Sequence, residues 1–347
     1  MKKEEFLKEY INTPSPSGYE MKLGGQQVWV DYVSKFAYDV EISTYGNAYA
    51  HYQEYDEKLP TIVLDAHCDE IGFFVFDITP SGFIKVGTLG GSDITITPSS
   101  RVNIWVDKDE PVVGVFGHPA IHVHKRKFES KKEDCFIDVG ASTKEEVLAM
   151  GITVGKPITM VDGFMKLGPY YCGRALDDKI GGYITSQVLR KLEKNNIKLN
   201  VNLIIVNSVQ EEVGLHGAQM ASSDIKPDIA IAIDVCHDTT SPAYNPNLQG
   251  SITAGDGAVI MSAPSIHNDM YELLVETAIS NDIKYQLTAS GGHSGTNADS
   301  YAFPNGAATG LLKLGMRYMH TTVETVHKDD VNACIKLLYN LLLSHVE

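Results

Sequence analysis

Two adjacent glutamates, Glu211 and Glu212, come shortly after an apolar segment at residues 201–206. The β-branched residues of this segment are typical of a buried strand. Two carboxylates near the end of such a strand are costly unless a cation offsets their charge. A metal ion would do so, because one carboxylate can bind it while its neighbour acts as a base on metal-bound water. Two exposed acids on a loop are the simpler interpretation of this pair taken alone.

Further acids and histidines take comparable places along the chain. Each of these residues follows a strand-like segment or begins a helix-like one. The set consists of His67, Asp69, Asp177, Asp178, Asp234 and His320. Ligands of open α/β sheets bind beyond the carboxyl ends of the strands, so we expect these groups to share one site. Imidazoles with several carboxylates and no cysteine favour zinc, cobalt or manganese.

Each group also has a simpler interpretation when taken alone. His67 could be a hydrogen-bonded core histidine, and Asp177 with Asp178 could cap a helix. Asp234, which ends a predicted strand, could begin a turn. We interpret two further residues, Glu324 and His327, as surface groups or as supports of the site.

Alternating strand-like and helix-like segments must position these groups. Short apolar runs predict buried strands, and the apolar periodicity of longer segments predicts helices. The main predicted strands are at residues 61–66, 201–206 and 227–233, and the main predicted helices are at residues 2–11, 19–36, 177–194, 268–280 and 329–345. This alternation predicts an α/β fold with a mostly parallel sheet between helix layers.

Residues 72–161 differ from the rest of the chain. Their short β-rich runs are separated by Gly, Pro and Asp, and one helix is predicted near residues 143–150. We therefore predict a small β-rich domain inserted into a larger catalytic domain, which comprises residues 1–71 and 162–347.

Three histidines of this segment, His118, His122 and His124, precede the cations at residues 125–127. Histidines at alternate positions of a strand place their rings on one face, so a separate zinc or anion site is one interpretation. Contact with a neighbouring subunit is the interpretation that we favour, because the segment lies in the predicted insertion.

Composition limits the classes of partner and compartment. The chain of 347 residues has a formal net charge of −15 and 43% hydrophobic residues. We expect neither nucleic acid nor an anionic membrane as a partner, because phosphate binding needs a basic face.

The five cysteines form no C-x-x-C pair, which is typical of reduced intracellular proteins. No signal peptide and no apolar run of transmembrane length is visible, so we expect a cytoplasmic protein.

Six stretches resemble the glutamyl aminopeptidase or tetrahedral aminopeptidase family of cytoplasmic metallopeptidases, of which some members have been labelled endoglucanases. They come in the family's order and span nearly the whole chain: residues 14–20, 65–72, 173–179, 209–214, 232–234 and 317–320. The resemblance implies a zinc-exopeptidase-like fold. It also implies that residues 72–161 mediate dimerisation, and that dimers build a homo-oligomer up to a tetrahedral dodecamer.

The resemblance implies two divalent metal ions per subunit, zinc or cobalt, with manganese as a further candidate. Asp177 would bridge the two ions. The other ligands would be His67 and Asp234 at one ion and Glu212 and His320 at the other. Two ions so placed can share a hydroxide and bind the substrate carbonyl.

The resemblance also implies roles for groups beside the ligands. Glu211 would be the general base, which then passes the proton to the leaving amine. Asp69 would lie behind His67 and fix the orientation of its ring. The peptide bond between Asp177 and Asp178 is expected to be cis.

Several positions depart from the family's pattern. Thr321 and Thr322 stand for Ser-Pro, Asn297 for Asp, Lys179 for Arg and Cys68 for Met. We expect the loop that carries Asn297 to border the substrate pocket, so this departure concerns specificity. Cys68 would make the site sensitive to oxidation or would be a buried inert thiol.

These observations predict a dinuclear metal-dependent aminopeptidase that removes N-terminal residues from short peptides, with a metal-bridging hydroxide as nucleophile. A metal-dependent deacylase or a carboxypeptidase-like amidohydrolase on the same site is the alternative, because related folds place the same ligands around different amides. A non-catalytic assembly protein is a further alternative, although no expected ligand or base is missing. A glycosidase would need a carboxylate pair free of metal. A preference for acidic residues would need a cationic pocket, and the sequence identifies no Lys or Arg for it.

Overall fold

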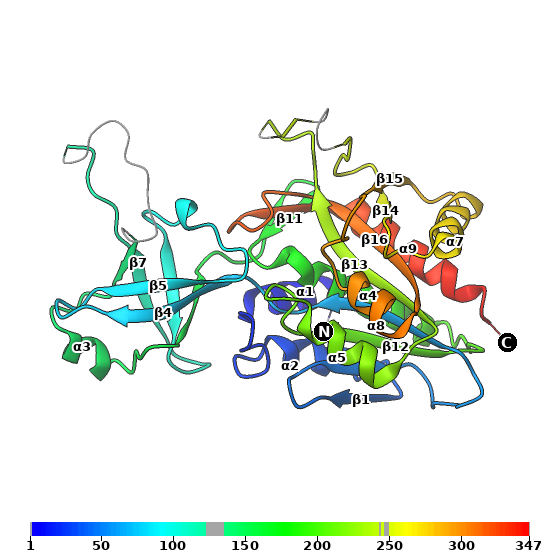
Figure 1. Cartoon of the computed structure of the whole chain (residues 1–347), viewed down its shortest axis with the longest axis horizontal. Helices are drawn as coiled ribbons and strands as arrows, with labels where there is room; N and C mark the ends of the chain where they lie inside the picture. Colours follow the sequence, from blue (N-terminus) through cyan, green and yellow to red (C-terminus); the bar gives the residue numbers. More distant parts are fainter. Residues whose placement is uncertain (1, 123–134, 243, 246–249, 347) are drawn as a thin grey trace.

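The molecule consists of an α/β body and a β-barrel at one end of it (Figure 1). The chain enters the barrel after β3 (Thr61–His67) and leaves it before β10 (Met165–Leu167). The computed structural model describes residues 2–122, 135–242, 244–245 and 250–346.

An eleven-stranded sheet forms the α/β body. Its four central strands, β12, β3, β13 and β16, are parallel, and most pairs at its margins are antiparallel. The order across the sheet is β1 (Asp39–Ile42), β2 (Ala48–His51), β12 (Asn202–Ser208), β3, β13 (Ile229–His237), β16 (Ala308–Arg317), β17 (Glu324–His327), β11 (Tyr170–Gly173) and β10, while β14 (Ala258–Ser262) pairs with β16 and β15 (Tyr285–Ala289). Every residue of β3 and β12 is buried, as expected of strands that are covered on both faces. The predicted α/β fold with a mostly parallel sheet is confirmed.

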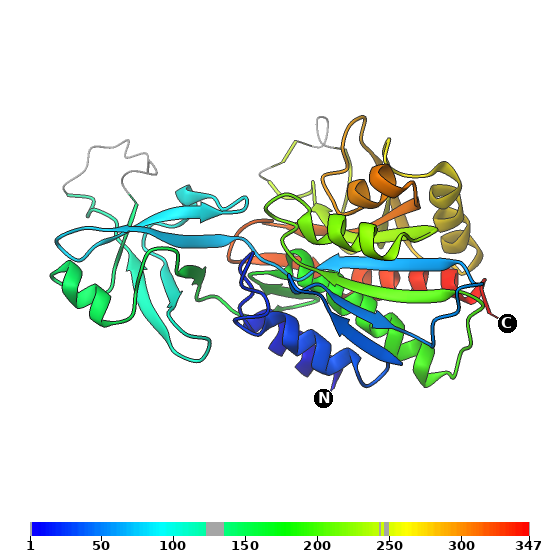
Figure 2. The ribbon, with the colours of Figure 1, turned by 60° about the horizontal axis from the view of Figure 1, so that its bottom comes forward.

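Helices cover both faces of this sheet (Figure 2). The largest apolar core lies on one face and includes residues of α1 (Lys3–Asn12), α2 (Gly25–Val33), α4 (Leu176–Lys194), α7 (Asn268–Ser280) and α9 (Lys328–Leu343). The core on the other face lies under α5 (His216–Ile225) and α8 (Ala298–Asn305). Within the described residues, no helix has both the length and the apolar character needed to cross a bilayer.

Strand alternation decides which face receives the candidate ligands. Val63 of β3 belongs to the core under α5 and α8, so Asp65 and His67 face the same side. Ala230 of β13 belongs to that core as well, which places Asp234 on this side of the sheet. The space beyond the ends of these strands, next to α8, is therefore where the site forms.

The β-barrel is closed by six antiparallel strands. Their order is β4 (Gly72–Ile78), β5 (Ile84–Leu89), β8 (Phe136–Asp138), β7 (Pro111–Phe116), β6 (Arg101–Trp105) and β9 (Pro157–Met160). The barrel has an apolar core of its own, to which Phe73, Ile104 and Ile158 contribute. Val147 of α3 (Lys144–Ala149) packs into the same core, so this helix closes one side of it.

Two predicted boundaries are wrong. The helix predicted from residue 19 begins at Gly25, because Gly24 takes a left-handed φ of 94° that ends the preceding turn. Asp234 does not end its strand, because β13 continues to His237 in register with β16.

Several elements were not predicted, among them β9, β10, β11, β17 and α8. The strands β10, β11 and β17 are short, and they become strands only by pairing with one another and with β16. The helix α8 contains Pro304 and follows a loop rich in Gly and Ser, so its sequence carries little helical periodicity. Tertiary pairing and packing therefore define these elements.

Candidate metal centre

The predicted ligands and base lie together at one edge of the central sheet. His67 comes from the end of β3, Asp234 from β13, Glu211 and Glu212 from the loop after β12, Asp177 from the first turn of α4 and His320 from the loop after β16. The peptide bond that follows Asp177 is cis, as the resemblance implied.

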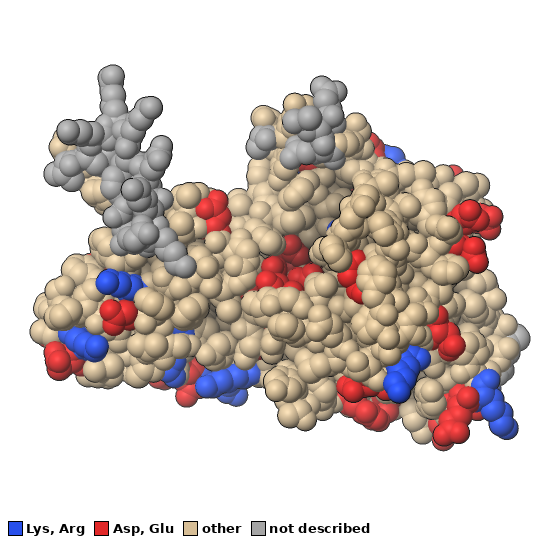
Figure 3. Space-filling model, in the orientation of Figure 1, with Lys and Arg blue, Asp and Glu red and all other residues tan. Residues whose placement is uncertain are grey.

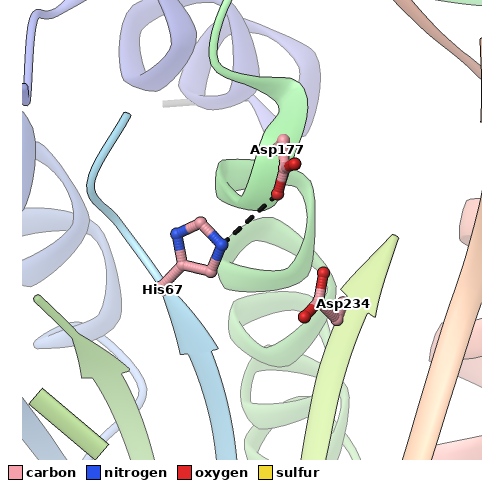
Figure 4. A group of neighbouring side chains, drawn as sticks. All are labelled: His67, Asp177 and Asp234. Atoms are coloured by element: carbon pink, nitrogen blue, oxygen red, sulfur yellow. Dashed lines mark ion pairs between the residues drawn. The ribbon is translucent and has the colours of Figure 1, made fainter. Parts of the chain in front are cut away.

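One group of side chains consists of His67, Asp177 and Asp234 (Figure 4). One ligand atom of each lies within 4.8 Å of the others, and all three residues are buried. Nε2 of His67 is 3.3 Å from Oδ1 of Asp177. In Figure 4 the three side chains come from two neighbouring strands and from the start of a helix and point toward a common centre.

A second group consists of Asp177, Glu212 and His320, whose ligand atoms also lie within 4.8 Å of one another. Nε2 of His320 is 3.4 Å from Oδ2 of Asp177 and 3.6 Å from Oε2 of Glu212. Asp177 therefore belongs to both groups and turns one carboxylate oxygen toward each histidine. This is the arrangement expected of a carboxylate that bridges two ions.

Buried negative charge is concentrated around these histidines. Burial and the nearby Asp234 raise the pKa of Glu211 to about 8. Asp177 behaves differently, because the imidazoles of His320 and His67 hold its pKa below the usual range although burial acts in the opposite direction. A carboxylate cluster that cannot ionise together without added positive charge is suited to divalent cations.

The other candidate ligands are shifted for similar reasons. Burial and the neighbouring Asp177 raise the pKa values of Glu212 and Asp234. The pKa of His320 is raised by its hydrogen bond to Asp177. The pKa of His67 is raised by the neighbouring carboxylates, although its burial acts in the opposite direction. The donor set of two imidazoles and several carboxylates fits zinc, cobalt or manganese.

Asp69 lies behind His67 and holds the loop after β12. Its Oδ1 is 3.4 Å from Nδ1 of His67. Its carboxylate accepts hydrogen bonds from the backbone N–H groups of Glu211 and Glu212, at 2.9 and 3.2 Å, and from the hydroxyl of Ser17 at 2.6 Å. One buried carboxylate therefore positions a histidine and both glutamates.

Glu324 connects two further candidate ligands, Asp177 and His320. It is only 2% exposed, so its interpretation as a surface group is wrong. Its carboxylate accepts the backbone N–H groups of Asp177 at 3.0 Å and of His320 at 2.9 Å. His327 accepts the backbone N–H of Asp329 at the start of α9, away from this contact.

A groove of about 760 Å³ opens over the candidate metal centre. Figure 3 shows Asp and Glu side chains gathered in a hollow near the middle of one face of the molecule. Leu215, Phe303 and Met319 give part of the groove wall an apolar surface. The groove also contains Lys313, a cation that the sequence pattern did not identify as a site residue.

The departures from the family's pattern have distinct surroundings. Asn297 is buried and donates to Oγ of Ser208 at 2.8 Å, whereas its neighbours in the loop line the groove. Cys68 is fully buried, and burial raises the pKa of its thiol, which favours the inert-thiol interpretation. Lys179 is buried and donates to two backbone carbonyl groups.

The separate histidine site cannot be built from the described residues alone. His124 and the cations at residues 125–127 lie outside them. Among the described residues, the two candidate groups of metal ligands are those that share Asp177. The separate histidine site and the subunit contact that we favour over it therefore both stay untested.

Comparisons with known proteins identify the family. Residues 46–337 match the family model described as M42 glutamyl aminopeptidase. The chain is 33% identical to the lysyl aminopeptidase of Pyrococcus furiosus, over 97% of this chain and 96% of that protein.

Solved structures agree with the sequence comparison. The TET aminopeptidase of a marine sediment Thaumarchaeota archaeon has a TM-score of 0.90 and 25% identity, covering 99% of this chain and 97% of its own. The Pyrococcus horikoshii TET1 peptidase, which can assemble into a tetrahedron or a large octahedral shell, has a TM-score of 0.85 and 28% identity, covering 98% and 99%. The protein is therefore a metal-dependent aminopeptidase that belongs to the M42 glutamyl aminopeptidase family.

Proposed function

We propose that the two groups that share Asp177 hold two divalent metal ions, zinc or cobalt, with manganese as a further candidate. His67 and Asp234 would complete one site, and Glu212 and His320 the other. The observation that carries this proposal is the orientation of Asp177, whose two oxygens lie 3.3 and 3.4 Å from the two histidines. When bound, the ions would supply Lewis-acid polarisation of the scissile carbonyl and activation of the attacking water.

Glu211 is the general base in this proposal. Its Oε2 lies 3.8 Å from Nε2 of His67, at the edge of the ligand group, and it lines the groove. It belongs to neither group of ligands, so its carboxylate is free to accept the proton of the attacking water and to donate it to the leaving amine.

Two supporting carboxylates maintain this arrangement. Asp69 fixes the ring of His67 and the backbone of Glu211, while Glu324 fixes the backbone of Asp177 and of His320. The substrates would be short peptides, because the groove over the centre is large enough for a few residues.

The assembly would be a homo-oligomer built from dimers, up to a tetrahedral dodecamer. We propose that residues 72–161 form an inserted dimerisation domain. Phe76 on β4 and Val113 on β7 are 62% and 58% exposed on the outside of the barrel, where a partner would cover them. The cytoplasmic location expected from the sequence stays a prediction.

The experiment that tests the proposed function compares free-amino aminoacyl anilides with their N-acetylated twins. Metal-stripped protein would be reconstituted with zinc, cobalt or manganese before each assay. We expect metal-dependent cleavage of the free-amine compounds alone. Equal cleavage of the acetylated compounds would contradict the proposal and favour the deacylase, and bound metal without any cleavage would favour the non-catalytic protein.

A further inference from the structure

A lysine whose side chain is mostly buried lies on the groove wall next to the candidate metal centre. Lys313 of β16 is in register with Asp234 of β13, and it lines the groove. Leu311, two residues earlier, packs in the core under α8, so Lys313 faces the same side of the sheet as that core. Strand pairing therefore fixes the position of this cation beside a candidate ligand.

Lys313 is only 8% exposed, and its Nζ has neither a hydrogen bond nor an ion pair with any residue that the structure describes. A mostly buried lysine whose ammonium group has no hydrogen bond or ion pair is costly. An anion that enters the groove would supply the missing charge-assisted hydrogen bonds.

The acid on the same wall outside the proposed metal centre is already satisfied. Asp299 accepts hydrogen bonds from Oγ of Ser294 at 2.8 Å and from the backbone N–H groups of Ser294 and Gly295 at 3.2 Å. His237, also on the groove wall, has its Nδ1 3.1 Å from the hydroxyl of Tyr244. Among the described residues of the wall outside the proposed metal centre and Glu211, the charged group without a partner is therefore the ammonium of Lys313.

We propose that Lys313 determines specificity by binding a carboxylate of the peptide substrate, an inference that rests on the proposed aminopeptidase function. Two carboxylates of a short peptide could reach the wall of the groove. One is the side chain of an acidic N-terminal residue, and the other is the C-terminal carboxylate of a dipeptide. In either position the ammonium disfavours a cationic group of the substrate.

A purely local role for Lys313 makes a different prediction. Its charge opposes the effect of burial on the pKa of Asp234, so it could serve only to keep that ligand ionised. Loss of Lys313 would then weaken metal binding and slow every substrate in the same proportion. Loss of a carboxylate-binding group instead changes the ratio between charged and uncharged substrates.

The test uses isosteric substrate pairs at about pH 7, where the carboxylates of the free substrates are ionised. One pair is the p-nitroanilides of glutamate and glutamine, and the other is the dipeptide Leu-Leu and its C-terminal amide. For each pair, kcat/KM would be measured with the wild-type protein, Lys313→Met and Lys313→Arg, all loaded with metal. Arginine preserves the charge, whereas methionine preserves most of the shape.

We expect one of the two ratios to exceed about tenfold in the wild-type protein, to fall by about 10- to 100-fold in Lys313→Met and to persist in Lys313→Arg. The pair that responds identifies which carboxylate is bound. Ratios near one in the wild-type protein, a ratio that survives in Lys313→Met, or equal losses on all four substrates together with lost metal would overturn the proposal.

Failure of the aminopeptidase function is a separate outcome. It would appear as no cleavage of any free-amine substrate by the wild-type protein with any of the metals. Calorimetric binding of the same pairs would then still decide the role of Lys313, because it needs no turnover.

Discussion

Glu324→Gln tests whether one buried carboxylate holds both halves of the metal centre. In the wild-type protein Oε2 accepts the backbone N–H of Asp177 and Oε1 that of His320. Glutamine keeps one carbonyl oxygen and turns an NH₂ group toward the other N–H, so one of the two hydrogen bonds is lost. The ligand whose N–H is lost then becomes less well positioned.

The magnitude follows from two opposing contributions. A hydrogen bond to a charged group contributes about 1.5–3 kcal/mol. Burial and the nearby Asp177 raise the pKa of Glu324, so removing its charge returns part of that free energy. A net loss of about 1–2 kcal/mol corresponds to metal binding about 5- to 30-fold weaker.

The assay is a titration of metal-stripped protein in a series of chelator-buffered metal concentrations. We expect the half-saturating metal concentration to rise for Glu324→Gln and turnover to recover at saturating metal. Glu272→Gln, a change on α7 away from the metal centre, is the matched control and should titrate like the wild-type protein. A folded Glu324→Gln variant with wild-type metal affinity would refute the assignment of Glu324 as the shared support.

Three further predictions address the base, the pH dependence and the assembly. Glu211→Gln should retain metal, measured by elemental analysis, and its kcat should fall by about 10²- to 10⁴-fold. Glu212→Gln should instead lose metal. A near wild-type kcat in Glu211→Gln would remove Glu211 from the base role. Burial raises the pKa of Asp330 from 3.8 to about 6 in the folded state. Between pH 3.8 and about 6 the folded protein therefore holds a proton on Asp330 that the unfolded protein has released, so the free energy of unfolding falls as the pH rises through this range. Urea unfolding at several pH values should therefore show the wild-type protein losing stability relative to Asp330→Asn between about pH 4 and 6, and a constant difference would contradict the shift. Replacing residues 72–161 by a short linker should dissociate the oligomer in sedimentation velocity, and a variant that sediments as the parent assembly would show that the insertion is not the dimerisation domain.

Much of the α/β body could be predicted because its sequence patterns are local. The central strands β3, β12 and β13 are continuous apolar runs, since helices cover both of their faces. The helix α7 has the bounds that its periodicity predicted. Acids and histidines next to such strand ends could be grouped from the sequence, because the ends of parallel strands meet at one edge of a sheet.

The supports of the site could not be predicted in the same way. Glu324 lies in a short strand that exists only through its pairing with β11 and β16, so nothing in the local sequence shows that its carboxylate is buried. The helix α8, which contains Pro304, gives no clear periodic signal and takes its place by packing against the sheet. Burial of a polar side chain depends on neighbours that are distant in sequence.

Lys313 shows most clearly what could not be predicted from the sequence. By itself it is a lysine within an apolar strand, and no spacing connects it with the candidate ligands. The register of β16 with β13 places it beside Asp234, and the walls of the groove bury most of its side chain. The sequence by itself determined the types of the candidate catalytic groups and the strands that carry them. Tertiary structure alone decided which charge remains unpaired in the groove, because strand register and burial arise only when distant segments pack together.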